Sequence, residues 1–153
     1  MWIPGFGKYS GKPAVGEAAP AFSARNQDGV MASLAGAPAE LPVVLVFYPR
    51  ASSPICTKQM CSMRDGWPDL SAKATVYGVS YDQPAELKVF QQAENLPFDL
   101  LSDPDKTIAK AYGVAGLFAA ARVSFVIGTD RRIKAVITDI KAKDHATQIL
   151  EAL

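Results

Sequence analysis

The feature that most constrains the fold is the apolar run Val43–Tyr48, which is followed by a proline-broken turn and a cysteine. The run is β-branched and aromatic, and it has about the length of a strand that is buried on both faces. Pro49 and Pro54 end the run, and Cys56 falls at the start of the helix expected next. At a helix start, free backbone N–H groups and the positive end of the helix dipole stabilise a thiolate relative to a thiol. The segment therefore predicts a reactive cysteine that the helix start brings to the surface.

The size and charge of the chain favour one domain spanning residues 1–153, with residues 1–14 as an extra N-terminal segment. The chain has 16 Lys and Arg against 15 Asp and Glu, and it has no long run of one sign. We therefore expect neither nucleic acid nor an anionic membrane as a partner. The apolar runs are short of the roughly 20 residues that cross a bilayer, and no signal peptide opens the chain. These observations predict a cytoplasmic protein.

Two cysteines and one histidine limit the possible metal sites. A closed zinc site needs four ligands, with Cys or His at short paired spacings. Cys56 and Cys61 have four residues between them, which fits neither a zinc knuckle nor a CxxC reductase. We expect no metal or other cofactor, and a structural disulfide is not expected in a reducing compartment.

The remaining pattern alternates strands and helices, as in a thioredoxin-like α/β domain with a central mixed β-sheet flanked by helices on both faces. A hairpin at the sheet edge is expected near the N-terminus, from Ala21–Arg25, a turn at residues 27–29, and Val30–Leu34. Further strands are expected at Thr75–Ser80, Val123–Ile127 and Ile133–Thr138. Helices are expected from Cys56 to about Leu70 with a break near Gly66, from Pro84 to about Asn95, from Ser102 to Tyr112, and from Ala146 to Leu153.

Pro49, Ser53 and Cys56 match the pattern P-x-x-x-[S/T]-x-x-C of peroxiredoxins. With Thr57 and Cys61, the segment YPRASSPICTKQMC resembles the Q-type branch, also called bacterioferritin comigratory proteins. The likeness covers nearly the whole chain from about residue 15, because three later stretches agree in order: GVSYDQPAELKVF, LPFDLLSDPDKTIAKAYGV and RVSFVIGTDRRI.

The resemblance implies a thiol-dependent peroxidase that reduces hydrogen peroxide and organic hydroperoxides. Cys56 matches the peroxidatic cysteine, which becomes sulfenic acid, and Cys61 matches the resolving cysteine, which then forms an intramolecular disulfide with it. Pro49 and Ser53 match residues that shield and hydrogen-bond the reacting centre, and Arg122 matches the arginine beside the thiolate. The resemblance also implies thioredoxin or a similar dithiol as reductant, an antioxidant role, and a monomer.

Four further residues bear on this interpretation. Gln59 stands where many members have Glu, which would weaken a contact with a nearby arginine, and Ile55 replaces a common glycine. Arg50 and Arg64 are near Cys56 in sequence, and either could share the electrostatic role of Arg122. The single histidine, His145, is expected to be solvated in the last helix.

Peroxide reduction by a thiolate sets two tasks, ionisation of the thiol and stabilisation of the departing oxygen. A free cysteine is about 3% thiolate at pH 7, so full ionisation can raise the rate by about thirty-fold. A thiol with a lower pKa is also less nucleophilic, which lowers the rate by about thirteen-fold. Preorganised donors must therefore supply most of the acceleration. The candidates are Arg122, Ser53 and the backbone N–H of Cys56.

The spacing of the cysteines predicts a conformational change. Residues five apart on a regular helix have Cα atoms roughly 8.6 Å apart, whereas a disulfide needs less than about 7 Å. If Cys61 resolves Cys56, the first turns of the helix must unwind in each cycle. Two alternatives remain open at this point, a thioredoxin-fold copper or metal-binding chaperone and a non-catalytic redox interaction protein.

Overall fold

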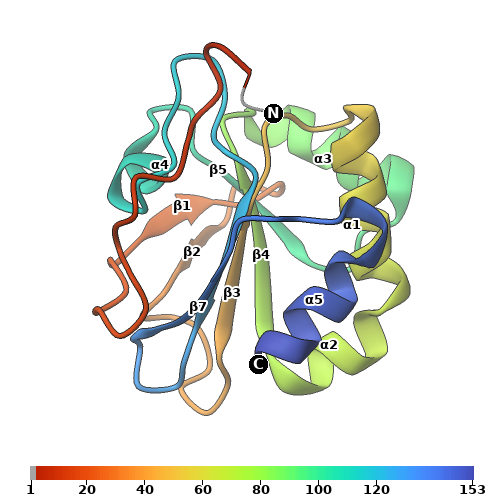
Figure 1. Cartoon of the computed structure of the whole chain (residues 1–153). Coiled ribbons are helices and arrows are strands. Elements are labelled where there is room, and N and C mark those ends of the chain that lie inside the picture. The colour runs from red at the N-terminus through yellow and green to blue at the C-terminus, as the bar shows by residue number, and fades with distance from the viewer. Residues whose placement is uncertain (1–2) are drawn as a thin grey trace.

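The computed structural model describes residues 3–153, which form a five-stranded mixed sheet and a separate two-stranded hairpin (Figure 1). The sheet has the order β5-β4-β3-β6-β7, so that β3 (Val43–Phe47) lies at its centre. Strands β3, β4 and β5 are parallel, whereas β6 is antiparallel to β3 and β7 is antiparallel to β6. The other bounds are Thr75–Ser80 for β4, Asp99–Ser102 for β5, Val123–Ile127 for β6 and Ile133–Ile137 for β7.

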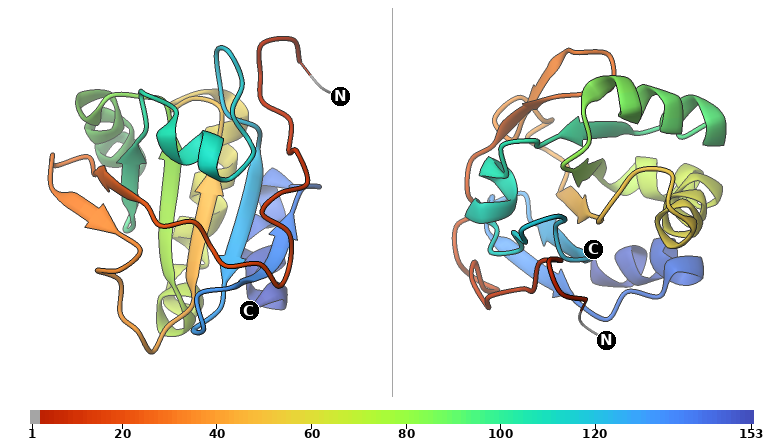
Figure 2. Two further views of the ribbon diagram at one scale, coloured as in Figure 1. Left: turned by 90° about the vertical axis from the view of Figure 1, so that its left-hand side faces the viewer. Right: turned by 90° about the horizontal axis from the view of Figure 1, so that it is seen from above.

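The two faces of the sheet carry different layers (Figure 2). One face is covered by α1 (Pro54–Asp65), α2 (Trp67–Lys73), α3 (Pro84–Glu94) and α5 (His145–Ala152), which follows the short 3-10 helix η1 (Ala142–Asp144). The other face carries α4 (Thr107–Ala111) and the hairpin of β1 (Ser23–Arg25) and β2 (Met31–Ser33). This layout confirms the predicted thioredoxin-like arrangement.

Strand β3 supplies both cores by simple alternation. Its five residues are completely buried. Val43, Leu45 and Phe47 join the cluster under α4, and Val44 and Val46 join the cluster under α1 and α3. Each such side chain contributes about 1.5–3 kcal/mol when it is fully buried. The prediction of a strand buried on both faces is therefore confirmed.

The break that Gly66 predicts is present between α1 and α2. The Gly66 N–H donates to the Ser62 carbonyl at 3.0 Å. A Cβ atom added to Gly66 would lie 2.8 Å from the Cβ of Ala146, so the glycine allows α5 to approach closely. The short α2 then returns the chain to the start of β4.

One expectation for the fold is wrong in detail. The segment before α4 contains a strand, β5, that was not predicted, and α4 begins at Thr107 rather than Ser102. The Asp103 carboxylate lies between them and accepts hydrogen bonds from the N–H groups of Ile108 (3.1 Å) and Ala109 (2.8 Å). The predicted hairpin is present beside the edge strand β5, where it forms a two-stranded sheet of its own.

The extra N-terminal segment is hydrogen-bonded to the domain from Gly5 onward, and the first two residues lie outside the described part. In the described part of the chain, no helix has the length and apolar character needed to cross a membrane.

Candidate active site

The sheet register brings Arg122 to the start of α1. Phe47, the last residue of β3, pairs with Val123, the first residue of β6. Because the two strands are antiparallel, the loop that leaves β3 lies beside the residue that precedes β6. Cys56 lies in the first turn of α1 after that loop, and Arg122 directly precedes β6. Residues 66 positions apart therefore meet at one end of the sheet.

The Cys56 thiol lies at the centre of this end. Arg122 Nη1 donates a hydrogen bond to the Cys56 Sγ at 3.3 Å. The first hydrogen bond of α1 runs from the Thr57 N–H to the Ser53 carbonyl at 2.8 Å. The N–H groups of Ile55 and Cys56 precede that bond, so no helical carbonyl accepts from them, and they are free to stabilise negative charge.

The expectation that the helix start exposes the cysteine is wrong, because Cys56 is completely buried. Its side chain belongs to the apolar cluster of Val44, Val46 and Met60. Burial keeps water from the sulfur, which strengthens the attraction of a nearby cation for a thiolate.

Gln59 orients the arginine. Its Oε1 accepts a hydrogen bond of 2.6 Å from the same Arg122 Nη1 that contacts the sulfur. Gln59 is completely buried, one turn after Cys56 on α1. Gln59 stands where many members of the family resembled have Glu, and it still contacts the arginine, as a neutral acceptor in place of a charged one.

The loop before α1 places the predicted residues Pro49 and Ser53 differently. Pro49 is buried beside the site. The Ser53 hydroxyl donates to the Arg50 carbonyl at 3.1 Å, so in this conformation it stabilises the loop and not the sulfur. The Asp82 carboxylate accepts from the Ala51 N–H at 2.7 Å and thereby ties the loop to the end of β4.

Tyr48 is a neighbour of Cys56 that the sequence reasoning missed. Its ring is completely buried, and its hydroxyl makes no well-formed hydrogen bond although it lies close to Ser80. Burial raises the pKa of Tyr48 far above its usual value, and the nearby Asp82 and Cys56 raise it further. The signal was the alternation of β3, which predicts that Tyr48 follows Val44 and Val46 onto the α1 face.

Cys61 lies on the same unbroken helix, and both cysteines are free thiols. The Cys61 Sγ donates to Glu94 Oε2 at 3.6 Å. Burial raises the pKa of the Cys61 thiol, and the Glu94 carboxylate raises it further, against the opposing effect of Arg64. The Arg64 guanidinium donates to the Glu94 carbonyl at 2.8 Å and is therefore directed toward α3.

His145 is buried, which corrects the expectation of a solvated side chain. Its Nδ1 lies 3.0 Å from Gln148 Oε1, and its Nε2 lies 2.8 Å from the Ser124 hydroxyl. Because Gln148 Oε1 can only accept, Nδ1 carries the proton and the Ser124 hydroxyl donates to Nε2. Burial lowers the pKa of His145, and the positive charge of Arg122 lowers it further. The sequence signal was its position one turn before the buried Ile149.

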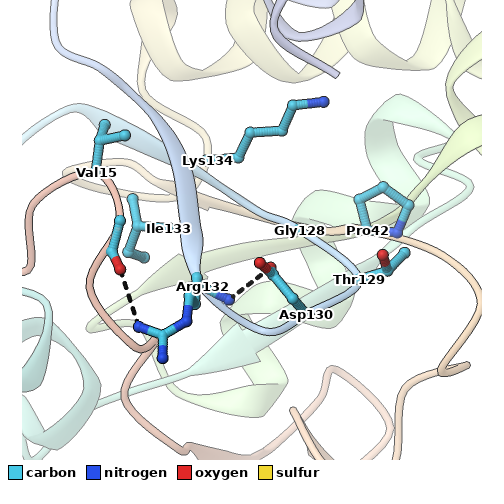
Figure 3. Close-up of a pocket in the computed structure, with 9 residues that line it drawn as sticks. Val15, Pro42, Gly128, Thr129, Asp130, Arg132, Ile133 and Lys134 are labelled. Carbon is cyan, nitrogen blue, oxygen red and sulfur yellow. Dashed lines mark hydrogen bonds between the residues drawn. The ribbon is translucent and has the colours of Figure 1, made fainter.

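A surface pocket at the other end of the sheet is separate from this site (Figure 3). It is lined by Pro42, before β3, and by the turn between β6 and β7, whereas Cys56 follows β3. The Arg132 guanidinium in this pocket donates to the Gly16 carbonyl at 3.0 Å. The backbone N–H of Arg132 donates to Asp130 Oδ1 at 3.1 Å. These polar groups fix the N-terminal chain and the turn to each other.

Across residues 3–153, no group of three or more His, Cys, Asp or Glu side chains could hold a metal ion. A buried sulfur in contact with a guanidinium and free N–H groups is suited to act as a nucleophile toward an atom whose leaving group gains negative charge.

Known proteins share the sequence and fold of this chain. A profile described as the AhpC/TSA family matches residues 15–136. Peroxiredoxin Bcp of Escherichia coli K12 is 36% identical over 147 residues, which cover 90% of this chain and 94% of that protein. The crystal structure of peroxidoxin BcpB from Mycobacterium tuberculosis is 31% identical with a TM-score of 0.84, over 90% of this chain and 94% of the other. A peroxiredoxin Q structure from Xanthomonas campestris shares the fold at a TM-score of 0.79 and 23% identity, over 86% of this chain and 88% of the other.

Proposed function

We propose that this chain, which belongs to the AhpC/TSA family and within it to the peroxiredoxins, reduces peroxides with Cys56 as attacking thiolate and Cys61 as resolving thiol. The chain is a thiol peroxidase, and its family uses peroxide substrates and thioredoxin-type reductants. The assignment of roles to residues rests chiefly on one observation, the 3.3 Å contact between Arg122 Nη1 and the buried Cys56 Sγ.

In the first step, the Cys56 thiolate attacks one oxygen of the peroxide. The S–O bond forms as the O–O bond breaks, and the leaving oxygen departs as water or an alcohol after it takes a proton. The guanidinium of Arg122 and the N–H groups of Ile55 and Cys56 stabilise the negative charge shared by sulfur and oxygen. Pro49 shields the site, and Ser53 holds the loop through Arg50.

In the second step, the Cys61 thiolate attacks the sulfenic sulfur of Cys56. The disulfide forms and hydroxide leaves as water. In the reduced structure α1 is continuous through both cysteines, so their Cα atoms are separated by roughly 8.6 Å on a regular helix, beyond disulfide reach. The first turn of α1 therefore unwinds before the disulfide forms.

In the third step, a dithiol reductant restores both thiols by exchange. We assign this role to thioredoxin or a protein of similar chemistry. We further propose that the protein acts as a monomer, because the site draws Cys56, Cys61 and Arg122 from one chain. A cytoplasmic location fits two free thiols, which a reducing compartment maintains.

The test is thiol counting and intact mass before and after one equivalent of hydrogen peroxide, for the wild type, Cys56→Ser and Cys61→Ser. We expect the wild type to lose two thiols and about two mass units, as disulfide formation requires. Cys56→Ser should keep its remaining thiol. Cys61→Ser should gain one oxygen on Cys56 but fail to sustain turnover with thioredoxin.

If the wild type still has two thiols after treatment with hydrogen peroxide, the proposed cysteine cycle is refuted and a binding module is favoured. Undiminished turnover by Cys61→Ser would refute only the resolving role of Cys61.

A further inference from the structure

The N-terminal segment (residues 3–14) runs beside the loop of residues 113–121, which connects α4 to Arg122 (Figure 1). The segment precedes the residues that the AhpC/TSA family profile matches. Four backbone hydrogen bonds join the two stretches of chain. They run from Ser10 N to Gly113 O at 2.8 Å, from Phe118 N to Gly5 O at 2.7 Å, from Ala119 N to Gly5 O at 3.4 Å, and from Gly7 N to Ala119 O at 2.7 Å.

Gly7 packs closely against this loop. A Cβ atom added to Gly7 would lie 1.9 Å from the Val114 carbonyl oxygen and 2.7 Å from the Ala121 nitrogen. These two atoms are themselves joined by the hydrogen bond from Ala121 N to Val114 O, 2.9 Å long, that closes the loop. Gly7 is also buried. The segment therefore packs against the bond that fixes the residue directly before Arg122.

The rest of the loop is fixed by other elements. The Tyr81 hydroxyl donates to the Gly116 carbonyl at 2.9 Å and accepts from the Gly116 N–H at 3.0 Å. The Lys106 ammonium donates to the Leu117 carbonyl at 2.7 Å. These contacts hold the tip of the loop, whereas the N-terminal segment holds residues 118 and 119, on the side that leads to Arg122.

We propose that the N-terminal segment positions Arg122, so that Gly7 is a positioning residue for peroxide reduction. The segment acts by fixing the backbone at residues 119–121, from which the guanidinium reaches Cys56 Sγ at 3.3 Å and Gln59 Oε1 at 2.6 Å. This inference depends on the proposed role of Arg122.

The test is a double-mutant cycle in the full-length chain, with Gly7→Ala and Arg122→Met alone and together. Gly7 does not have a left-handed backbone conformation, so Gly7→Ala changes only the space beside Val114 and Ala121. The readout is the second-order rate constant for oxidation of Cys56 by hydrogen peroxide. Lys8→Ala is the matched control, because the Lys8 side chain is exposed on the same segment.

We expect Gly7→Ala to slow the reaction between about ten-fold and 100-fold, as small misplacements of a catalytic group do. Lys8→Ala should react at the wild-type rate. In the Arg122→Met background, Gly7→Ala should cause no further loss, because the group that it misplaces is already absent. A merely structural role of the segment would slow the reaction by the same factor in both backgrounds.

Different outcomes separate this inference from the proposed function. A wild-type rate for Arg122→Met would refute the role of Arg122. If Arg122→Met reacts slowly but folded Gly7→Ala reacts at the wild-type rate, only the positioning role of the segment is overturned. The same holds if Gly7→Ala slows the reaction by equal factors in the wild-type and Arg122→Met backgrounds. If Gly7→Ala does not fold, a chain that starts at Lys8 replaces it in the same cycle, and an unchanged rate for that chain overturns the inference.

Discussion

Replacement of Arg122 by methionine removes the cation that contacts the Cys56 sulfur at 3.3 Å. At this distance, two unit charges attract by about 5 kcal/mol at an effective dielectric constant near 20, and by about 1.3 kcal/mol in bulk water. Cys56 is buried and Arg122 is partly exposed, so an intermediate value of about 3 kcal/mol is reasonable. In the transition state the negative charge is shared by the sulfur and the departing oxygen, and the loss of an attraction of this size to that charge corresponds to a rate about 150-fold lower in the first step.

Replacement by lysine should recover little of this loss. The Arg122 guanidinium is planar and remains charged while it donates to both Sγ and Gln59 Oε1. A lysine ammonium is a compact point charge on a flexible stem, with no planar group to hold one nitrogen between both acceptors in a fixed orientation. We therefore expect Arg122→Lys to react within about ten-fold of Arg122→Met.

The assay is rapid mixing with excess hydrogen peroxide in a Cys61→Ser background, followed by quenching and mass analysis of Cys56. This background isolates the first oxidation from disulfide formation. Arg64→Met is the matched control for charge, because Arg64 lies on α1 but donates to the Glu94 carbonyl. A rate for Arg122→Met within about three-fold of its parent, or an equal loss for Arg64→Met, would refute the electrostatic reasoning.

Three further predictions concern the helix, the histidine and the second thiol. In the Cys56–Cys61 disulfide form, amide hydrogens in the first turns of α1 should exchange much faster than in the reduced protein; equal protection in the two forms would contradict the unwinding. Burial lowers the pKa of His145, so the unfolded chain binds a proton first, and stability should fall as the pH drops below about 6.5, by up to about 1.4 kcal/mol per pH unit. His145→Gln should lose this slope in denaturant titrations at several pH values, and an identical slope in both proteins would exclude His145 as its source. In Cys56→Ser protein, Glu94→Gln should lower the pKa of the Cys61 thiol and speed its alkylation at neutral pH, because a carboxylate that raises this pKa is removed; an unchanged alkylation rate would show that Glu94 does not raise it.

The sequence was sufficient to predict the central strand and the start of the helix that follows it. The run of β-branched residues that ends at Tyr48 predicts a strand from its own composition, without knowledge of the strands beside it. This is possible because every position of the run is buried in the sheet. The juxtaposition of Cys56 and Arg122 came from the resemblance alone, because no local pattern relates residues 66 positions apart. The register of β3 and β6 supplies its physical basis.

Features that depend on packing between distant segments were not predictable. β5 is a four-residue strand, and its pairing with β4 alone makes it a strand. The burial of Cys56 depends on Arg122 and on the apolar cluster under α1. The position of Cys56 at the start of a helix gives no information about either of them. His145 is buried because Ser124, on a strand 21 positions earlier, offers its hydroxyl to the ring. A polar side chain with such a partner is stable in a core that its residue type alone would not predict.

The two halves of α1 are suited to different steps of the cycle. Met60 and Met63 are completely buried and anchor the second half, whereas Ile55 in the first turn is exposed and Cys56 is the residue of that turn that is completely buried in the core. The contact between Arg122 and a thiolate is charge-assisted, and such hydrogen bonds are roughly twice as strong as neutral ones. Oxidation converts the thiolate to a neutral sulfenic acid, so the first chemical step itself weakens the contact that holds the first turn closed. Arg122 therefore favours the wound helix before the peroxide reacts, and loses much of that effect when Cys56 must move toward Cys61.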